Sequence, residues 1–292
     1  MLFTIVIAND YIVQYTANAN VIPEIEIGDF KASLISRSSA LRMRKDPSVK
    51  RIVKNELQDM LFNVQENVTW GIDRIDAMGM DNKYDYPSIA GKDTVAYILD
   101  TGINTKHVDF ENRATFGFDA TGEGMVDNNG HGTHVAGVVG GLHYGVAKQV
   151  NLVAVKVCNG SGQCRNSWVL KGLEFAVKRM LTTGLKSTIN MSLGIKKNSL
   201  WDDAVKAVVK SGIVVVVAAG NSATDACTYS PANVPEVITV GATNRVKNQD
   251  TMASFSNNGK CVDVNAPGVG ITSAWKDSLT GSKTISGTSI SF

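Results

Sequence analysis

Short strand patterns alternate with helical patterns from about Trp70 onward, and this alternation constrains the fold more than any other feature. Val214 to Val217 are apolar on successive residues, which is typical of a strand buried on both faces of a parallel sheet. Such alternation implies right-handed crossovers, so it predicts an α/β domain of three layers with a mainly parallel central sheet. The expected strands span 94–99, 151–157, 187–192, 212–219, 236–240 and 261–265, and the expected helices span 166–181 and 200–211, the second capped by Ser199.

The first 60 or so residues differ from the rest, since they contain no cysteine and one glycine, Gly28. We expect a strand at 10–15 and a helix at 30–44, whereas 49–61 fits either a helix or a strand. The apolar residues 1–8 favour a first strand over a degenerate or incomplete signal peptide. These patterns predict a small α+β segment, 1–64, before a domain at 65–292.

Composition excludes several function classes. The 292 residues are enough to bury a core, and the net charge of +2 gives no case for nucleic acid or an acidic substrate. The Lys and Arg residues between 37 and 54 are interpreted as a solvated surface rather than a polyanion site. No apolar run is long enough to span a membrane.

Polar residues follow the expected strands beside glycine turns. Asp100 comes directly after the strand at 94–99, and Asn221 follows Gly220 after the strand at 212–219. His131 stands between two glycines at the mouth of a small-residue helical run, and Ser289 lies near the end of the chain. Because functional residues of α/β domains gather at the carboxyl ends of strands, we expect these four side chains to meet.

Acyl transfer is the chemistry that needs this set. A serine hydroxyl is a poor nucleophile until a base removes its proton, and histidine is a suitable base near neutral pH. A buried carboxylate orients the histidine, and an amide donor stabilises the oxyanion. The sequence therefore predicts Asp100 as the orienting acid, His131 as the base, Ser289 as the nucleophile and Asn221 as the oxyanion donor.

Several motifs carry a family resemblance. Asp100-Thr101-Gly102-Ile103, the stretch from Asn129 to Gly137, and Ser286-Gly287-Thr288-Ser289 occur in that order, with further matches at 144–148, 159–162, 191–194, 218–221, 229–232 and 255–257. The chain resembles the subtilisin-like serine peptidases, and within them the proteinase K and cerevisin group. The chain order Asp, His, Ser is also that of subtilisin. The resemblance implies a subtilisin-like fold and a serine endopeptidase of broad specificity with an apolar preference.

The resemblance also implies binding sites. Gly160-Ser161-Gly162 and Ser192-Leu193-Gly194 are similar to the two edges that pair with an extended substrate, and Ala218-Ala219-Gly220 is similar to a wall of the primary pocket. Ile195 stands where the family often has a second glycine. No cofactor is expected for the chemistry. A structural calcium is expected at the carbonyls of Pro235 and Val237 and the carboxylate of Asp263.

Residues 1–64 occupy the place of the family's inhibitory propeptide, although the usual propeptide is longer. The resemblance therefore implies autocleavage near 62–65, with polypeptide substrates and the chain's own propeptide as partners. A monomer is expected.

The four cysteines allow three pairings. The resemblance implies a bond between Cys227 and Cys261. Cys158 and Cys164 are left as either a small closed loop across the substrate edge or two free thiols. Disulfides favour a secreted protein or one of a vacuole-like compartment.

His134 follows His131 by three residues, but no third ligand stands at a spacing suited to zinc. We interpret His134 as a packed structural histidine, and His107 and His143 as surface or packing residues.

The chain stops at Phe292, where the family continues into a long helix that carries the nucleophile. From this we expect Ser289 to lack a fixed position, and the chain alone to be unstable or inactive. The alternative to a peptidase is an inactive, truncated pseudopeptidase that binds peptides or a partner at the same cleft.

Overall fold

The computed structural model describes residues 11–55, 62–76, 80–247 and 249–291. The chain divides into two compact units, Met1–Met60 and Leu61–Phe292, which are described separately. The expected element at 1–8 lies outside the described residues. Among the described residues no helix is long and apolar enough to cross a membrane.

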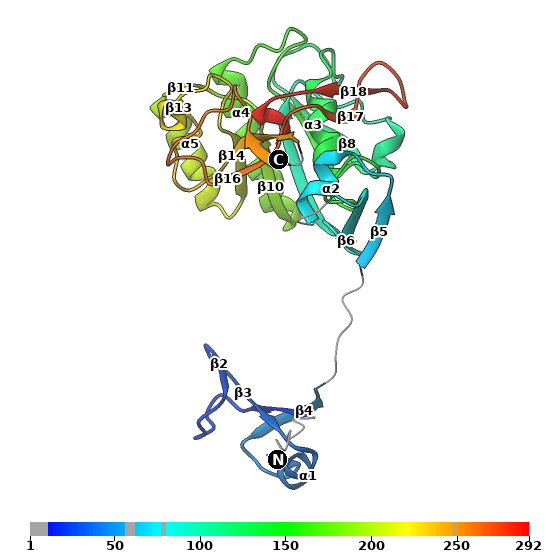
Figure 1. The fold of residues 1–292 in the computed structure, drawn as a ribbon. Coiled ribbons are helices and arrows are strands. Elements are labelled where there is room, and N and C mark those ends of the chain that lie inside the picture. The colour runs from blue at the N-terminus through cyan, green and yellow to red at the C-terminus, as the bar shows by residue number, and fades with distance from the viewer. Residues whose placement is uncertain (1–10, 56–61, 77–79, 248, 292) are drawn as a thin grey trace. The chain divides into compact units, whose positions relative to one another are not determined.

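The first unit contains a four-stranded antiparallel sheet in the order β2-β3-β1-β4 (Figure 1). Val13, Tyr15 and Ala19 form its small core. The elements are β1 (Tyr11–Tyr15), β2 (Ile25–Ile27), β3 (Phe30–Ile35), α1 (Arg37–Met43) and β4 (Val49–Lys54).

The helix expected at 30–44 is half wrong, because its first six residues form strand β3. This strand pairs with β1 on one side and β2 on the other, so the ladder overrides local helix preference. The helix begins only after Ser36, whose hydroxyl accepts a hydrogen bond from the Ser39 amide at 3.3 Å. The ambiguous stretch at 49–61 is a strand up to Lys54, and its last residues lie outside the described ones.

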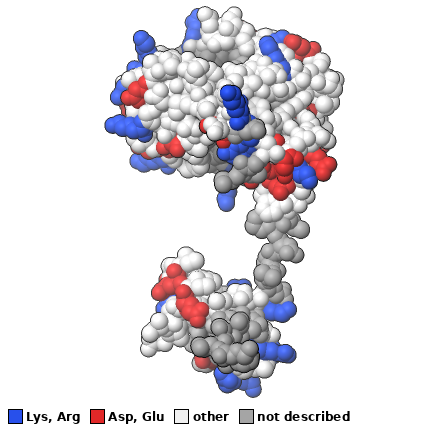
Figure 2. Space-filling model, in the orientation of Figure 1, with Lys and Arg blue, Asp and Glu red and all other residues white. Residues whose placement is uncertain are grey.

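The Lys and Arg residues between 37 and 54 are all exposed, as predicted for a solvated surface. Both signs of charge occur on the visible face of each unit (Figure 2).

The second unit confirms the three-layer α/β fold. An eight-stranded sheet runs in the order β15-β14-β12-β10-β7-β9-β8, with β16 beside β14. Among the described strands of this sheet, only β15 is antiparallel to its neighbour. Helices α4 and α5 cover one face, and α3 packs against the other (Figure 1). The strands of the sheet are β7 (Thr94–Asp100), β8 (Ala114–Asp119), β9 (Asn151–Lys156), β10 (Lys186–Met191), β12 (Val214–Ala218), β14 (Ile238–Val246), β15 (Gln249–Met252) and β16 (Val264–Pro267).

The helices of this unit are α2 (Trp70–Asp76), α3 (His131–Gly140), α4 (Asn166–Thr183) and α5 (Ser199–Lys210), with short 3-10 turns η1 (Val108–Phe110), η2 (Ala226–Thr228) and η3 (Thr288–Ile290). Three small sheets complete it: β5 (Phe62–Glu66) with β6 (Lys83–Pro87), β11 (Ile195–Lys196) with β13 (Tyr229–Ser230), and β17 (Ile271–Ala274) with β18 (Ser282–Ile285).

Two local expectations are corrected. Asn198, not Ser199, caps α5, because its side-chain oxygen accepts from the amides of Leu200 and Trp201. Val214 is 48 % exposed, because it lies at the beginning of β12, where the covering layers do not reach. Burial on both faces therefore does not extend over the whole Val214–Val217 run.

Candidate active site

Asp100 is the last residue of β7 and is buried. One of its carboxylate oxygens accepts a hydrogen bond from the Thr101 amide at 2.7 Å. Its carbonyl oxygen accepts from the amides of Val157 and Cys158, which anchors the turn to the end of the neighbouring β9. The carboxylate is thus held at the carboxyl edge of the sheet, where the sequence predicted it.

His131 is the first residue of α3, and its Nδ1 lies 2.8 and 2.9 Å from the two carboxylate oxygens of Asp100. Burial lowers the pKa of His131, but the charge and hydrogen bond of Asp100, with the charge of Asp127, raise it by more. The glycines on either side are required by space. A Cβ at Gly130 would clash with the Trp275 ring, and one at Gly132 would lie 2.1 Å from the Gly102 carbonyl oxygen.

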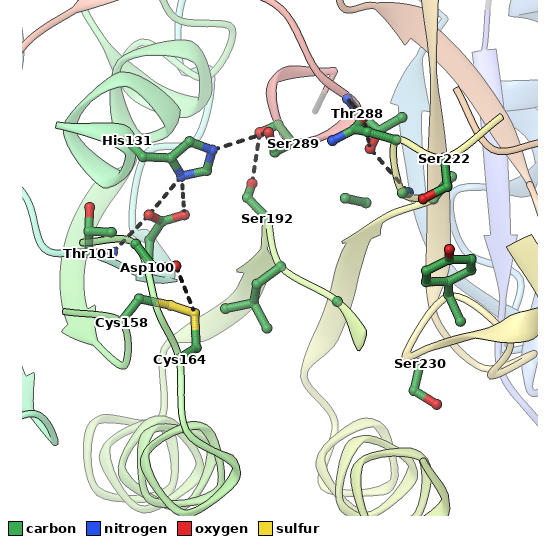
Figure 3. A pocket seen from close by; sticks show the side chains of 18 of the residues that line it. Asp100, Thr101, His131, Cys158, Cys164, Ser192, Ser222, Ser230, Thr288 and Ser289 are labelled. Carbon is green, nitrogen blue, oxygen red and sulfur yellow. Dashed lines mark hydrogen bonds and ion pairs between the residues drawn. A yellow bond between two sulfur atoms is a disulfide. The ribbon is translucent and has the colours of Figure 1, made fainter. Parts of the chain in front are cut away.

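Ser289 lies in η3, and its hydroxyl oxygen is 3.1 Å from His131 Nε2 (Figure 3). The structure therefore places Ser289 within hydrogen-bond distance of the base, while the expectation that the chain alone is unstable or inactive stays a prediction. The turn is held from both sides: Thr288 and Ile290 are buried, and the Ser289 carbonyl accepts from the Ser192 hydroxyl at 2.8 Å.

Asn221 faces the same turn. Its side-chain oxygen accepts from the amide and the hydroxyl of Thr288, at 2.8 and 3.0 Å. The Gly220 amide donates to the same hydroxyl at 3.1 Å. Because its oxygen is occupied, the NH₂ group of Asn221 is left as a donor beside Gly287 and Ser289.

A cleft of about 460 Å³ collects these four side chains. Figure 3 shows His131 between Asp100 and Ser289, with Ser192 below the serine. Of the sequence-predicted substrate-binding residues, the cleft is lined by Ser192, Leu193, Gly194, Ala218, Gly220 and Gly162.

Gly160 and Ser161 are not among the residues that line the cleft. Both polar backbone groups of Gly160 are engaged within the protein, because its amide donates to Glu123 and its carbonyl accepts from the Asn129 side chain. The role of these two residues as a substrate edge stays a prediction.

Both pairs of cysteines form disulfides, Cys158–Cys164 and Cys227–Cys261. The first closes the loop that carries Gly162 and lies beside Asp100 (Figure 3). This decides the pairing that the sequence left open.

Of the three other histidines, two are buried and one is exposed. His134 is fully buried, and its Nε2 lies 3.1 Å from the carbonyl oxygens of Ile271 and Lys283. Burial lowers the pKa of His134 to about 4. His107 is buried and binds the Gly281 carbonyl, while His143 is exposed.

The residues expected to bind calcium are compatible with an oxygen-ligand site. One carboxylate oxygen of Asp263 accepts from the Thr239 amide at 2.8 Å, which holds the carboxylate near the segment with Pro235 and Val237. No group of three or more His, Cys, Asp or Glu residues in the described part of the chain is placed to hold a metal ion. Backbone carbonyls would have to complete the site, so calcium stays a prediction.

Two buried charged residues near the site were missed by sequence reasoning. Asp127 is 4 % exposed and accepts hydrogen bonds from residues around both Asp100 and His131. Lys156 is fully buried and donates to the Thr101 carbonyl at 2.7 Å. The available signals were a carboxylate four residues before His131 and a lone cation in an apolar strand.

Comparison with known proteins gives one family model and several similar serine proteinases. A family model described as the subtilase family matches residues 91–291. The "Extracellular serine proteinase" of Thermus sp. (strain Rt41A) is 47 % identical over 255 residues, covering 85 % of this chain and 60 % of the relative. The "Alkaline serine exoprotease A" of Vibrio alginolyticus is 42 % identical over 290 residues, covering 94 % of this chain and 52 % of the relative.

Among solved structures, one described as a cold adapted subtilisin-like serine proteinase is similar with a TM-score of 0.71 and 43 % identity. That similarity covers 77 % of this chain and 81 % of the other. The chain spans only about half to three fifths of the length of its curated relatives.

Proposed function

The chain belongs to the subtilase family, and on this premise we propose that it is a serine endopeptidase that hydrolyses peptide bonds through Asp100, His131 and Ser289. The observation that supports this most strongly is the continuous chain of hydrogen-bond contacts from Asp100 through His131 to Ser289 in one cleft. The same contacts are those that nucleophilic acyl transfer needs.

In this mechanism the Ser289 hydroxyl oxygen attacks the scissile carbonyl carbon while His131 Nε2 takes its proton. The Asp100 carboxylate, hydrogen-bonded to Nδ1, stabilises the imidazolium that forms. The NH₂ group of Asn221 and the Ser289 amide donate to the oxyanion. His131 then gives the proton to the leaving amine, and a water molecule, deprotonated by His131, hydrolyses the acyl-enzyme.

The proposed substrate is an extended polypeptide that pairs with the edge at Ser192–Gly194 and the loop at Gly160–Gly162. An apolar side chain would enter beside Ala218 and Gly220, which supports an apolar preference. Pairing with the substrate backbone supports broad specificity. The predicted calcium would stabilise the segment around Asp263 and would take no part in the chemistry.

We further propose that residues 1–64 serve as an inhibitory propeptide and that the protein is secreted and monomeric. The relative from Thermus is named as extracellular, and the two disulfides support an oxidising compartment. N-terminal sequencing of active enzyme tests the first point: a start within 62–65 supports processing, and retention of Asp10 contradicts it.

The central test is covalent labelling of the purified chain with a fluorophosphonate serine probe, with Ser289→Ala as the matched control. We expect labelling of the wild type and none of the variant. Circular dichroism and a cooperative thermal transition verify that both are folded. A folded wild-type chain that takes up no probe would overturn the proposal and favour a peptide-binding pseudopeptidase.

A further inference from the structure

Asp127 precedes α3 and is buried, with 4 % of its surface exposed. Both of its carboxylate oxygens accept hydrogen bonds. Oδ1 accepts from the Thr101 hydroxyl at 2.9 Å and from the amides of Asn129 and Gly130 at 3.0 and 2.8 Å. Oδ2 accepts from the amide and hydroxyl of Thr133 at 3.0 and 2.6 Å. Five donors offset the cost of burying this charge.

These donors come from two segments that carry different members of the triad. Thr101 directly follows Asp100, whereas Asn129, Gly130 and Thr133 surround His131. The Thr101 hydroxyl extends the link, because it also accepts from the Gly132 amide at 3.0 Å. Asp127 therefore ties the turn at Asp100 to the first turn of α3.

We propose that Asp127 is a positioning residue: it locks the Asp100 turn to the beginning of α3, so that His131 Nδ1 stays within hydrogen-bond distance of Asp100. The inference rests on the proposed peptidase function but concerns a residue outside the triad. A displacement of about 1 Å at a catalytic group costs on the order of 100-fold in rate, so a lock of this kind has a large expected effect.

The charge of Asp127 adds a second consequence. The charged and titratable groups around His131 are Asp100 from β7, Asp127 from the preceding loop and His134 from the same helix, and Lys276 in turn faces Asp127. Asp100 and Asp127 both raise the pKa of His131, against burial. A neutral residue at 127 lowers that pKa, so the base is free at lower pH.

The test compares Asp127→Asn with the wild type on a chromogenic peptide. Asparagine keeps one oxygen for the Oδ1 partners, removes the charge and presents an NH₂ group to the Thr133 amide. We expect kcat to fall roughly 10- to 100-fold with KM changed by less than about twofold. We also expect the acidic limb of the pH profile of kcat/KM to move to lower pH.

Asp109→Asn is the matched control, since Asp109 is another buried aspartate, 5 % exposed, that binds the His143 amide away from the cleft. It should keep the wild-type kcat and the wild-type acidic limb. An Asp127→Asn enzyme with unchanged kcat and an unchanged limb would overturn the proposal.

A second pair of variants covers the case in which Asp127→Asn does not fold. Thr101→Val removes the hydroxyl that joins Asp127 to the Asp100 turn, and Thr101→Ser restores it. We expect the valine variant to lose kcat and the serine variant to recover most of it; full activity in Thr101→Val would contradict the lock.

Failure of the peptidase function is separable from failure of this inference. The His131 ring is titrated by NMR, with its signal assigned by its absence in His131→Ala. If the wild type takes up no serine probe, but the pH midpoint of His131 is lower in Asp127→Asn than in the wild type, then the peptidase function fails and the coupling of Asp127 to His131 stands. If the midpoint and kcat of Asp127→Asn both equal those of the wild type, then the coupling is rejected.

Discussion

The two sides of the cleft are held in different ways. Asp100 and His131 come from the end of a central strand and the first position of the helix α3, and Asp127 joins their segments. Ser289 lies on one 3-10 turn, which is tied to Gly220 and Asn221 and to Ser192, 97 residues earlier. One buried carboxylate therefore joins the segments on the acid–base side, whereas the nucleophile side depends on the ends of β10 and β12.

The largest expected effect tests whether the two sides act as one unit. His131→Ala and Ser289→Ala should each lower kcat by about 10⁴- to 10⁶-fold, and the double variant should be no worse than the more damaged single variant. The reason is that the base has no function without the nucleophile. Steady-state kinetics on a peptide substrate measures this, and multiplicative losses would show that the two residues act independently.

The next effect concerns Asn221, which has two separable roles on the nucleophile side. Asn221→Asp keeps an oxygen for the Thr288 amide but removes the NH₂ donor to the oxyanion. We expect kcat to fall roughly 10²- to 10³-fold, which corresponds to about 3–4 kcal/mol, with little change in KM. Thr288→Val serves as the control for anchoring alone. If it equals Asn221→Asp, then the effect lies in the turn and not in oxyanion binding.

The two disulfides differ in the length of the loop that they close and in whether they line the cleft. Cys227–Cys261 closes 34 residues and Cys158–Cys164 closes 6, so loop entropy predicts losses in the free energy of unfolding of about 4 and about 2 kcal/mol on double replacement by serine. Only the loss of Cys158–Cys164, whose loop lines the cleft, should raise KM. Urea denaturation and Michaelis–Menten kinetics measure the two. If KM rises only on loss of Cys227–Cys261, then that disulfide, and not Cys158–Cys164, supports the substrate-binding cleft.

A further effect, which depends on pH, concerns His134, which connects α3 to the β17–β18 hairpin leading to Ser289. Its pKa is about 4 in the folded chain and 6.5 as the ordinary value. Between these values the unfolded chain binds more protons, so the free energy of unfolding falls by up to about 3 kcal/mol as pH drops from 6.5 to 4.

His134→Gln keeps an NH donor for the hairpin carbonyls and does not titrate. Urea denaturation at pH 7 and pH 4.5 should therefore show a smaller pH-dependent loss in the variant than in the wild type. Equal losses would mean that other groups carry the acid sensitivity.

The sequence was sufficient for the central fold because each element carried its own signal. Short strand patterns predicted β7, β9 and β10 within a few residues, and the apolar stripe at helical spacing predicted α4. The sequence was insufficient for β3, since this short segment has helical character but forms a strand between β1 and β2. Strand pairing of this kind depends on partners distant in the chain.

The residues of the candidate site also fall into those that the sequence predicted and one that it did not. Turn chemistry and residue type were enough to propose Asp100, His131, Asn221 and Ser289 as site residues. The buried role of Asp127 could not be predicted, because an aspartate in a polar, glycine-rich loop is most often a solvated turn residue.

The sequence by itself determined the alternation of strands and helices in the second unit and the residue types available for chemistry, because periodicity and turn signals are local. The tertiary structure alone decided that Ser289 comes within 3.1 Å of His131, 158 positions earlier, that Cys158 pairs with Cys164, and that one buried carboxylate joins two segments of the site. These outcomes depend on packing and hydrogen bonds between distant segments, which no local pattern encodes.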